Sequence, residues 1–306
     1  MKNVKEKKLR ITIIVFSPSG NTLTAAKLFE QSFLKRNAQV QLINFTARKE
    51  IADQKSIAKY LNDIVNPHDV LCIGGPVYAG HLQENVKNII KALPLPDDKW
   101  GPMVVPFISY GGVHSSIALK EAGGLLRKRN RKNISGVKIA ASHSLTKKFE
   151  FSINENKPGE EEIQVIDSLA DRVVEAVGKE FNEIKDVSNS FSYISFGENL
   201  LYNIFSEKMF HKMMFGKREI KHNKCTGCGV CAKRCPMQII EMRDKKPEIN
   251  KNSSAGCCYC AECYNKCKFD AISWDLSKSK KYLSHMNNKG KFESQQSAVY
   301  PLNQVK

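Results

Sequence analysis

The sequence predicts an α/β protein in which a doubly wound, five-stranded parallel sheet is followed by a small α+β domain. Two observations predict this arrangement. In the first ~180 residues, short apolar runs typical of strands alternate with longer stretches typical of helices. Nine of the ten cysteines then fall between Cys225 and Cys267. A chain of 306 residues is long enough for about two domains.

The strands of the sheet are expected near residues 9–17, 38–45, 69–75, 102–110 and 136–143. The helices are expected near residues 21–36, 54–65, 83–92, 115–130 and 160–181. Strict alternation of five strands and five helices predicts the strand order 2-1-3-4-5, in which ligands bind beyond the carboxyl ends of the strands. No apolar stretch is long enough to predict a transmembrane segment.

The loop after the first strand reads Ser17-Pro18-Ser19-Gly20-Asn21-Thr22. The hydroxyls of Ser17, Ser19 and Thr22, together with N–H groups at the start of the helix, can hold a phosphate. The alternative is a plain capped helix start. The loop has neither a G-x-G-x-x-G pattern nor a P-loop lysine, which disfavours dinucleotides and nucleoside triphosphates.

Two more loops carry glycines and a tyrosine: Gly74 to Gly80 after the third strand and Ser109 to Val113 after the fourth. Small residues there allow a flat ring to approach closely, and Tyr78 can stack on it. Together the three loops resemble those with which flavodoxins bind FMN. The resemblance implies an FMN site formed by Ser17, Ser19, Gly20, Asn21, Thr22, Pro76, Val77, Tyr78, Ala79, Gly80, Ser109, Tyr110, Gly111 and Gly112.

Eight of the clustered cysteines repeat one spacing, C-x2-C-x2-C-x3-C, first from Cys225 to Cys235 and again from Cys257 to Cys267. The doubled run resembles a bacterial two-[4Fe–4S] ferredoxin, in which the fourth cysteine of each run ligates the other cluster. The resemblance implies that cluster I is held by Cys225, Cys228, Cys231 and Cys267, and cluster II by Cys257, Cys260, Cys263 and Cys235. Pro236 matches the ferredoxin pattern, whereas Lys268 stands where a second proline is common.

Zinc sites and disulfides are the other interpretations of clustered cysteines. Zinc ribbons separate two C-x2-C pairs by a longer gap, and disulfide frameworks belong to secreted chains. The N-terminal apolar run ends without a signal-peptide cleavage pattern, so we expect a cytoplasmic protein. Cys258 is left over, and we interpret it as a free and buried thiol. Cys72 is expected to pack inside a strand.

As a whole, residues 9–275 resemble the flavodoxin–ferredoxin fusion proteins known as EFR-type ferredoxins. We therefore divide the chain into a flavodoxin-like domain (1–185), an aromatic connector helix (186–215), a ferredoxin domain (216–276) and a basic, disordered tail (277–306). The connector is expected to dock the ferredoxin domain onto the sheet domain through its apolar side. The alternative is a helix that binds a membrane surface or a partner.

The net charge of +17 is unusual for an electron carrier. Part of the excess lies in the segments Arg127 to Arg129 and Arg131-Lys132. Such a basic face can steer an acidic redox partner, for instance a ferredoxin, a flavodoxin or an oxidoreductase. A plain solvated surface is the alternative, and no nucleic acid is expected because no module that recognises it is present. The oligomeric state stays open.

These features predict an electron-transfer protein that passes single electrons between two [4Fe–4S] clusters and FMN, and then to a redox partner. The alternative is an FMN-dependent reductase with a small-molecule substrate of its own, in which His114 or His143 donates a proton. His81 also follows a strand end and is a candidate for proton transfer, and the alternative for all three histidines is a hydrogen-bonded loop residue. A third interpretation is a redox-sensing module with little turnover.

Overall fold

The larger part of the molecule is organised by one sheet, with the strand order β12-β7-β5-β3-β1-β2. The computed structural model describes residues 8–250, 253, 255–288 and 296–302. The five parallel strands are β1 (Arg10–Val15), β2 (Gln39–Asn44), β3 (His68–Tyr78), β5 (Trp100–Tyr110) and β7 (Gly136–Ala140). Their order confirms the predicted 2-1-3-4-5 arrangement, which is typical of flavodoxin-like sheets.

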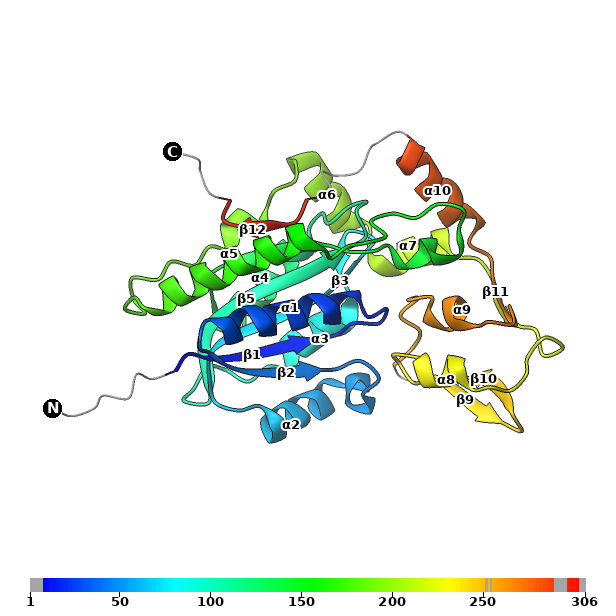
Figure 1. Cartoon of the computed structure of the whole chain (residues 1–306), viewed down its shortest axis with the longest axis horizontal. Helices are drawn as coiled ribbons and strands as arrows, with labels where there is room; N and C mark the ends of the chain where they lie inside the picture. The colour runs from blue at the N-terminus through cyan, green and yellow to red at the C-terminus, as the bar shows by residue number, and fades with distance from the viewer. Residues whose placement is uncertain (1–7, 251–252, 254, 289–295, 303–306) are drawn as a thin grey trace.

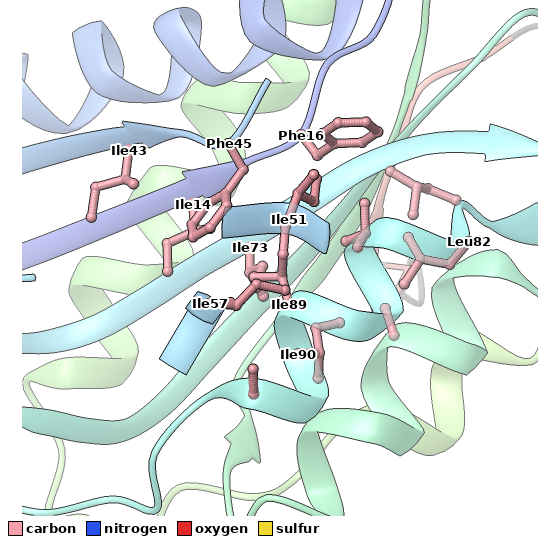
Figure 2. Close-up of a cluster of buried hydrophobic side chains, with 14 of the residues drawn as sticks. Ile14, Phe16, Ile43, Phe45, Ile51, Ile57, Ile73, Leu82, Ile89 and Ile90 are labelled. Atoms are coloured by element: carbon pink, nitrogen blue, oxygen red, sulfur yellow. The ribbon is translucent and has the colours of Figure 1, made fainter. Parts of the chain in front are cut away.

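Helices cover both faces of this sheet (Figure 1). Alternate strand residues point to opposite faces, so Ile13 packs toward α1 and α5, whereas Ile14 packs toward α2, α3 and α4. Figure 2 shows the second of these cores, where Ile14 and Phe45 meet Ile57. The helices are α1 (Asn21–Lys35), α2 (Gln54–Ile64), α3 (Glu84–Ala92), α4 (Ala118–Arg127) and α5 (Glu160–Val177).

The ends of these helices follow from local chemistry. The Asp53 carboxylate accepts the N–H of Ser56 at 2.9 Å and begins α2. The Glu162 carboxylate accepts the N–H of Gly159 at 2.8 Å and begins α5. Short elements complete the domain, namely β4 (His81–Leu82), β6 (Lys132–Asn133) and the 3-10 turns η1 (Lys49–Ala52), η2 (Ser144–Lys148) and η3 (Ser188–Phe191).

The aromatic connector differs from the single predicted helix. It forms two helices, α6 (Phe196–Ile204) and α7 (Glu207–Met214). The break falls at Ser206, whose hydroxyl accepts the N–H of Met209 at 3.3 Å and begins the second helix. None of the α6 residues is buried, and Phe196 is 86% exposed. The prediction that the connector docks through its apolar side is therefore wrong for α6.

The small domain consists of two antiparallel strand pairs and two short helices. Strand β8 (Arg218–Ile220) pairs with β11 (Ile272–Trp274), and β9 (Ile240–Arg243) pairs with β10 (Lys246–Ile249). Helices α8 (Val230–Arg234) and α9 (Glu262–Lys266) each end one residue before a cysteine, Cys235 and Cys267 respectively.

The segment after the small domain was predicted as a disordered tail, and the structure corrects this. It forms helix α10 (Ser277–Asn288) and strand β12 (Ala298–Tyr300), which pairs antiparallel with the edge strand β7. Leu283 and Tyr300 are buried, and the Tyr300 ring stacks on Tyr193 with centroids 4.9 Å apart. A few apolar residues among many lysines therefore suffice to anchor this segment. Residues 289–295 and 303–306 of the predicted tail lie outside the described residues.

The small domain packs against the carboxyl-end side of the large sheet (Figure 1). The N–H of Ala47 donates to the Pro236 carbonyl at 2.9 Å. The Asn265 side chain donates to the Ser144 carbonyl at 2.9 Å. Buried residues of both domains belong to one apolar core, which places the two halves in direct contact. Within the described part of the chain, no helix has the length and apolar character needed to cross a membrane.

Candidate functional site

A cavity of about 360 Å³ lies where the carboxyl ends of the parallel strands meet the small domain. One wall comes from the loops that follow β1, β3, β5 and β7. Ten of the fourteen residues predicted to bind FMN line it: Ser19, Asn21, Pro76, Val77, Tyr78, Ala79, Gly80, Ser109, Tyr110 and Gly111. The volume lies within the range of small-molecule sites.

The other four predicted residues, Ser17, Gly20, Thr22 and Gly112, do not line the cavity. The hydroxyl of Ser17 accepts the N–H of Leu23 at 2.8 Å, and the hydroxyls of Thr22 and Ser109 lie 2.6 Å apart. Two of the three hydroxyls predicted to hold a phosphate are thus buried and bonded within the protein. In this loop Ser19 and Asn21 are the residues that face the cavity.

The two tyrosines predicted to bound a flat ring have different surroundings. The Tyr78 hydroxyl is buried without a hydrogen-bond partner among the described residues, and burial raises the pKa of Tyr78 well above its ordinary value. The Tyr110 hydroxyl donates to the Gln296 carbonyl at 3.2 Å, so this ring is held in place by the chain leading into β12. Of these two hydroxyls, that of Tyr78 is the one without a partner among the described residues.

The opposite wall of the cavity was not predicted. It comes from α6, α7, α10 and the cysteine-rich loop, and most of its side chains are apolar or aromatic. They are Leu201, Tyr202, Phe205, Phe210, His211, Met213, Met214, Phe215, Tyr259, Ser279, Tyr282 and Leu283. The connector and the predicted tail therefore enclose the site, although neither was assigned a role in it.

The histidines considered as proton donors are placed differently. His143 packs against Gly111, and burial lowers the pKa of His143 to about 4, so its ring is neutral near pH 7. His81 Nδ1 lies 2.9 Å from the Glu121 carboxylate, and its Nε2 lies 2.6 Å from the Phe205 carbonyl. This geometry makes His81 a structural link between β4 and the connector. His114 and His143 both line the cavity.

A buried acid and a buried base lie on α7 and were missed by the sequence analysis. Glu207 and His211 are one helical turn apart, and His211 Nδ1 lies 4.0 Å from Glu207 Oε1. Burial raises the pKa of Glu207 to about 7 and lowers the pKa of His211 to about 4. The i, i+4 spacing was the available signal, but it is common on solvated helices.

Replacing Glu207 with glutamine is expected to stabilise the protein at about pH 8 by about 3 kcal/mol and to change little at about pH 5. The raised pKa means that the folded protein keeps this carboxyl protonated up to about pH 7. The contribution of Glu207 to the free energy of unfolding is therefore fully present below the pKa of this carboxyl in the unfolded chain. It is lost as the pH rises through the pKa of the same carboxyl in the folded protein. Thermal unfolding of the assembled protein under argon at both pH values tests this. Glu175→Gln, at an exposed position, is the control.

Four cysteines border one small cavity of about 20 Å³ in the outer part of the small domain: Cys225, Cys228, Cys231 and Cys267. This is the set expected for cluster I, including the exchanged fourth residue. The N–H of Ala271 points at Cys267 Sγ from 3.3 Å. Gly227 and Gly229 have φ angles of +73° and +71°, which lets the loop bend around this cavity.

The second set, Cys235, Cys257, Cys260 and Cys263, lies on the inner side of the small domain. Cys235, Cys260 and Cys263 are buried in the core that both domains share. Arg218 Nη1 lies 3.1 Å from Cys257 Sγ, and the N–H of Tyr259 donates to the same sulfur at 3.3 Å. Both contacts direct N–H donors at the Cys257 sulfur.

Cys258 is buried as predicted, and its thiol is hydrogen-bonded to Cys260, which raises the pKa of Cys258 well above its ordinary value. Cys72 is fully buried in β3, also as predicted. Among the described His, Cys, Asp and Glu side chains, no three lie close enough together to hold a single metal ion.

Aromatic side chains connect the second cysteine set with the cavity. Tyr259 stands between Cys257 and Cys260, and its ring lines the cavity. The Tyr259 ring centroid lies 4.4 Å from that of His211 and 5.5 Å from that of Phe215, on which it stacks. A tyrosine between two clustered cysteines gives no sequence signal of its own, so this contact could not be predicted.

The basic segment predicted as a steering surface is only partly exposed. Arg131 is buried beside Trp100, and burial lowers the pKa of Arg131 to about 10. Arg129 donates to the Leu93 carbonyl through Nε at 2.9 Å. Two of the arginines thus hold α4 and its following turn in place, which leaves Arg127 and Lys128 on the surface.

Comparison with known proteins identifies the cysteine-rich part. Residues 224–285 match the family described as "4Fe-4S dicluster domain". A ferredoxin of Methanothermococcus thermolithotrophicus is 34% identical over 56 residues, which cover 18% of this chain and 90% of that protein. An uncharacterized protein of Methanocaldococcus jannaschii is 33% identical over 66 residues, 22% of this chain. The match spans 24% of that relative's length.

Among solved structures, an archaeal flavodoxin aligns with 56% of this chain and 100% of its own, at 16% identity and a TM-score of 0.38. The strand order described above, and not this weak overall similarity, defines the sheet as flavodoxin-like.

Proposed function

This chain belongs to the 4Fe–4S dicluster ferredoxin family through residues 224–285, and it joins that domain to a flavodoxin-like sheet. We therefore propose that it is an iron–sulfur flavoprotein that transfers electrons between two [4Fe–4S] clusters and FMN. One observation carries the proposal. Tyr259, from the loop that holds Cys257 and Cys260, lines the same cavity as the loops after β1, β3 and β5.

The residues of the cavity suit FMN. Ser19 and Asn21 lie at the start of α1, where helix N–H groups favour a phosphate. A Cβ at Gly80 would lie 2.5 Å from Tyr202, and one at Gly111 would lie 2.5 Å from His143, so only glycine keeps these loops in place. The Tyr78 hydroxyl and His143 Nδ1, on two residues that line the cavity, are buried polar atoms without a partner among the described residues.

The two cysteine sets suit [4Fe–4S] clusters, each of which takes four thiolates. Clusters supply single-electron storage, and FMN when bound supplies exchange between one-electron and two-electron transfer. The chain contributes the rest. Buried Cys235, Cys260 and Cys263 bring the inner set against the sheet domain, and the stacked rings of His211, Phe215 and Tyr259 lie between this set and the cavity.

Anaerobic purification with quantitation of iron, sulfide and flavin tests the proposal. We expect two [4Fe–4S] clusters and one FMN per chain, and reduction with a one-electron donor should bleach the flavin band. A fully assembled protein without flavin, or one in which reduced clusters never reduce the flavin, would contradict it.

A second candidate is a reductase that acts on its own substrate. The observation in its favour is the apolar wall of the cavity, where Leu201, Phe205 and Met213 border the space beyond the glycine loops. Such a wall suits a flat, apolar substrate stacked on the ring. Steady consumption of a small molecule by the reduced protein, without a second protein present, would favour this function over electron transfer.

A further inference from the structure

The two cysteine sets differ in exposure, so the small domain has one set on its solvent side and the other on its buried side. In the inner set three of the four cysteines are buried. In the outer set Cys228 is exposed, and Cys225, Cys231 and Cys267 are partly exposed. Figure 1 shows the loop between β8 and α8, which carries the first two of these cysteines, at the outer edge of the small domain, away from the large sheet. The outer set therefore faces solvent while the inner set faces the cavity.

The surface around the outer set is apolar at its centre. Val230 and Phe269 line the small cavity bordered by the outer cysteines, and they are 37% and 49% exposed. Met242, 37% exposed, lies 4.0 Å from the position of a Cβ at Gly229. Exposed apolar side chains beside a redox centre are typical of the centre of a protein–protein contact.

Exposed lysines surround this apolar centre. Lys221 bonds through its N–H to the carbonyl of Ala271, which lines the outer cavity, and Lys224 precedes Cys225. Lys245 packs against Gly227, and Lys268 follows Cys267. All four side chains are exposed.

The acids near this surface are few and mostly paired. Asp270 forms an ion pair with Lys148 at 2.6 Å, and Glu241 and Glu248 both pair with Arg243. Asp244, in the turn before Lys245, is exposed. The exposed side chains at this face therefore carry an excess of positive charge.

We propose that this face, formed by Val230, Met242 and Phe269 within a rim of Lys221, Lys224, Lys245 and Lys268, is the docking surface for a small acidic electron-carrier protein. The proposal rests on the proposed function. With clusters bound, the outer cysteine set would receive one electron from the reduced carrier, which is oxidised in that step, and the inner set would pass it on toward the cavity that Tyr259 lines. Each transfer would move one electron from one centre to the next and change no covalent bond. Apolar contact brings the two redox centres close together, while the lysines attract the acidic carrier and orient it.

The test compares two triple charge reversals in the fully assembled chain. Lys224→Glu, Lys245→Glu and Lys268→Glu alter the proposed face. Lys27→Glu, Lys35→Glu and Lys55→Glu change the net charge equally but lie on α1 and α2 of the large domain, and all six lysines are exposed. Stopped-flow mixing with a reduced acidic ferredoxin gives the rate of electron transfer to each protein.

At an ionic strength of about 0.02 M, we expect the first variant to be reduced at least tenfold more slowly than the wild type, and the difference to shrink at about 0.5 M. The second variant should stay within about twofold, because its charges lie outside the contact. Equal slowing of both variants, or of neither, would overturn the proposal.

Two further measurements separate this proposal from its alternatives. Photoreduced deazaflavin, a small reductant, should reduce both variants at the wild-type rate. If wild-type protein accepts electrons from deazaflavin and passes them to flavin, the proposed function stands even when docking fails. EPR-monitored titration gives the cluster potentials. A shift in potential that accounts for the whole loss of rate would mean that the lysines tune the cluster, and that too would overturn the docking surface.

Discussion

Replacing Cys257 with serine is expected to remove about half of the iron from the assembled protein, whereas replacing Cys258 with serine should remove none. The two residues are adjacent, but only the Cys257 sulfur lies 3.1 Å from the Arg218 guanidinium and accepts the N–H of Tyr259. Cys258 instead bonds to Cys260, and a serine hydroxyl can replace that bond. Iron and sulfide analysis after anaerobic reconstitution measures the difference.

The same pair of variants tests the route of the electron. In Cys257→Ser the outer cluster should still be reduced, while reduction of the flavin by a protein donor should slow by at least about tenfold, since the inner cluster no longer links the two. EPR of the reduced protein shows which cluster remains. Full iron in Cys257→Ser together with half in Cys258→Ser would place the ligand at Cys258.

Deleting residues 277–306 is expected to weaken flavin binding by about 100-fold or more. The deletion removes both Tyr282 and Leu283 from the cavity wall, and burial of one large apolar side chain is worth about 2 kcal/mol. The deletion also removes β12 and uncovers the edge of β7, so aggregation should increase. Flavin titration monitored by fluorescence, with light scattering for aggregation, measures both effects.

Point variants separate the wall from the edge strand. Leu283→Ala keeps β12 but removes the buried side chain, so it should weaken flavin binding by about tenfold. Lys281→Ala, on the exposed side of the same helix, is the matched control and should leave binding unchanged. Wild-type affinity in both the deletion and Leu283→Ala would show that α10 does not enclose the cofactor.

The sheet was predictable because its signal is local. Each strand is an apolar run and each helix has a polar side. The predicted strand 38–45 therefore differs from β2 by one residue at each end, and the predicted helix 54–65 differs from α2 by one residue at its C-terminal end. The cysteine spacing was equally informative, because a cluster needs its thiolates at fixed positions around it.

The cavity was predictable only on the sheet side. Loops after parallel strands converge at one edge by topology, which is why Ser19, Tyr78 and Gly111 were found. The opposite wall depends on contacts between segments far apart in the sequence. Tyr259 lies between two ligand cysteines, and Leu283 lies in a lysine-rich helix that resembles a disordered tail by composition.

The surroundings of single groups could not be predicted, because burial decides them. Ser17 and Thr22 have the residue types of a phosphate loop, but both hydroxyls are buried and bonded within the protein. His143 was chosen as a proton donor for its position after a strand, and burial keeps it neutral. Arg131 was counted as surface charge and is buried beside Trp100. A sequence pattern states which group is present but not how much water reaches it.

Because each cysteine run contributes its fourth residue to the other set, the outer and inner sets are linked through the same helices. Cys267, which borders the outer cavity, ends α9, and the same helix contains Cys263 of the inner set. Loss of a group held by the outer set would therefore free the end of the helix that carries Cys263. We expect disturbance of the exposed set to reach the buried set through this shared helix.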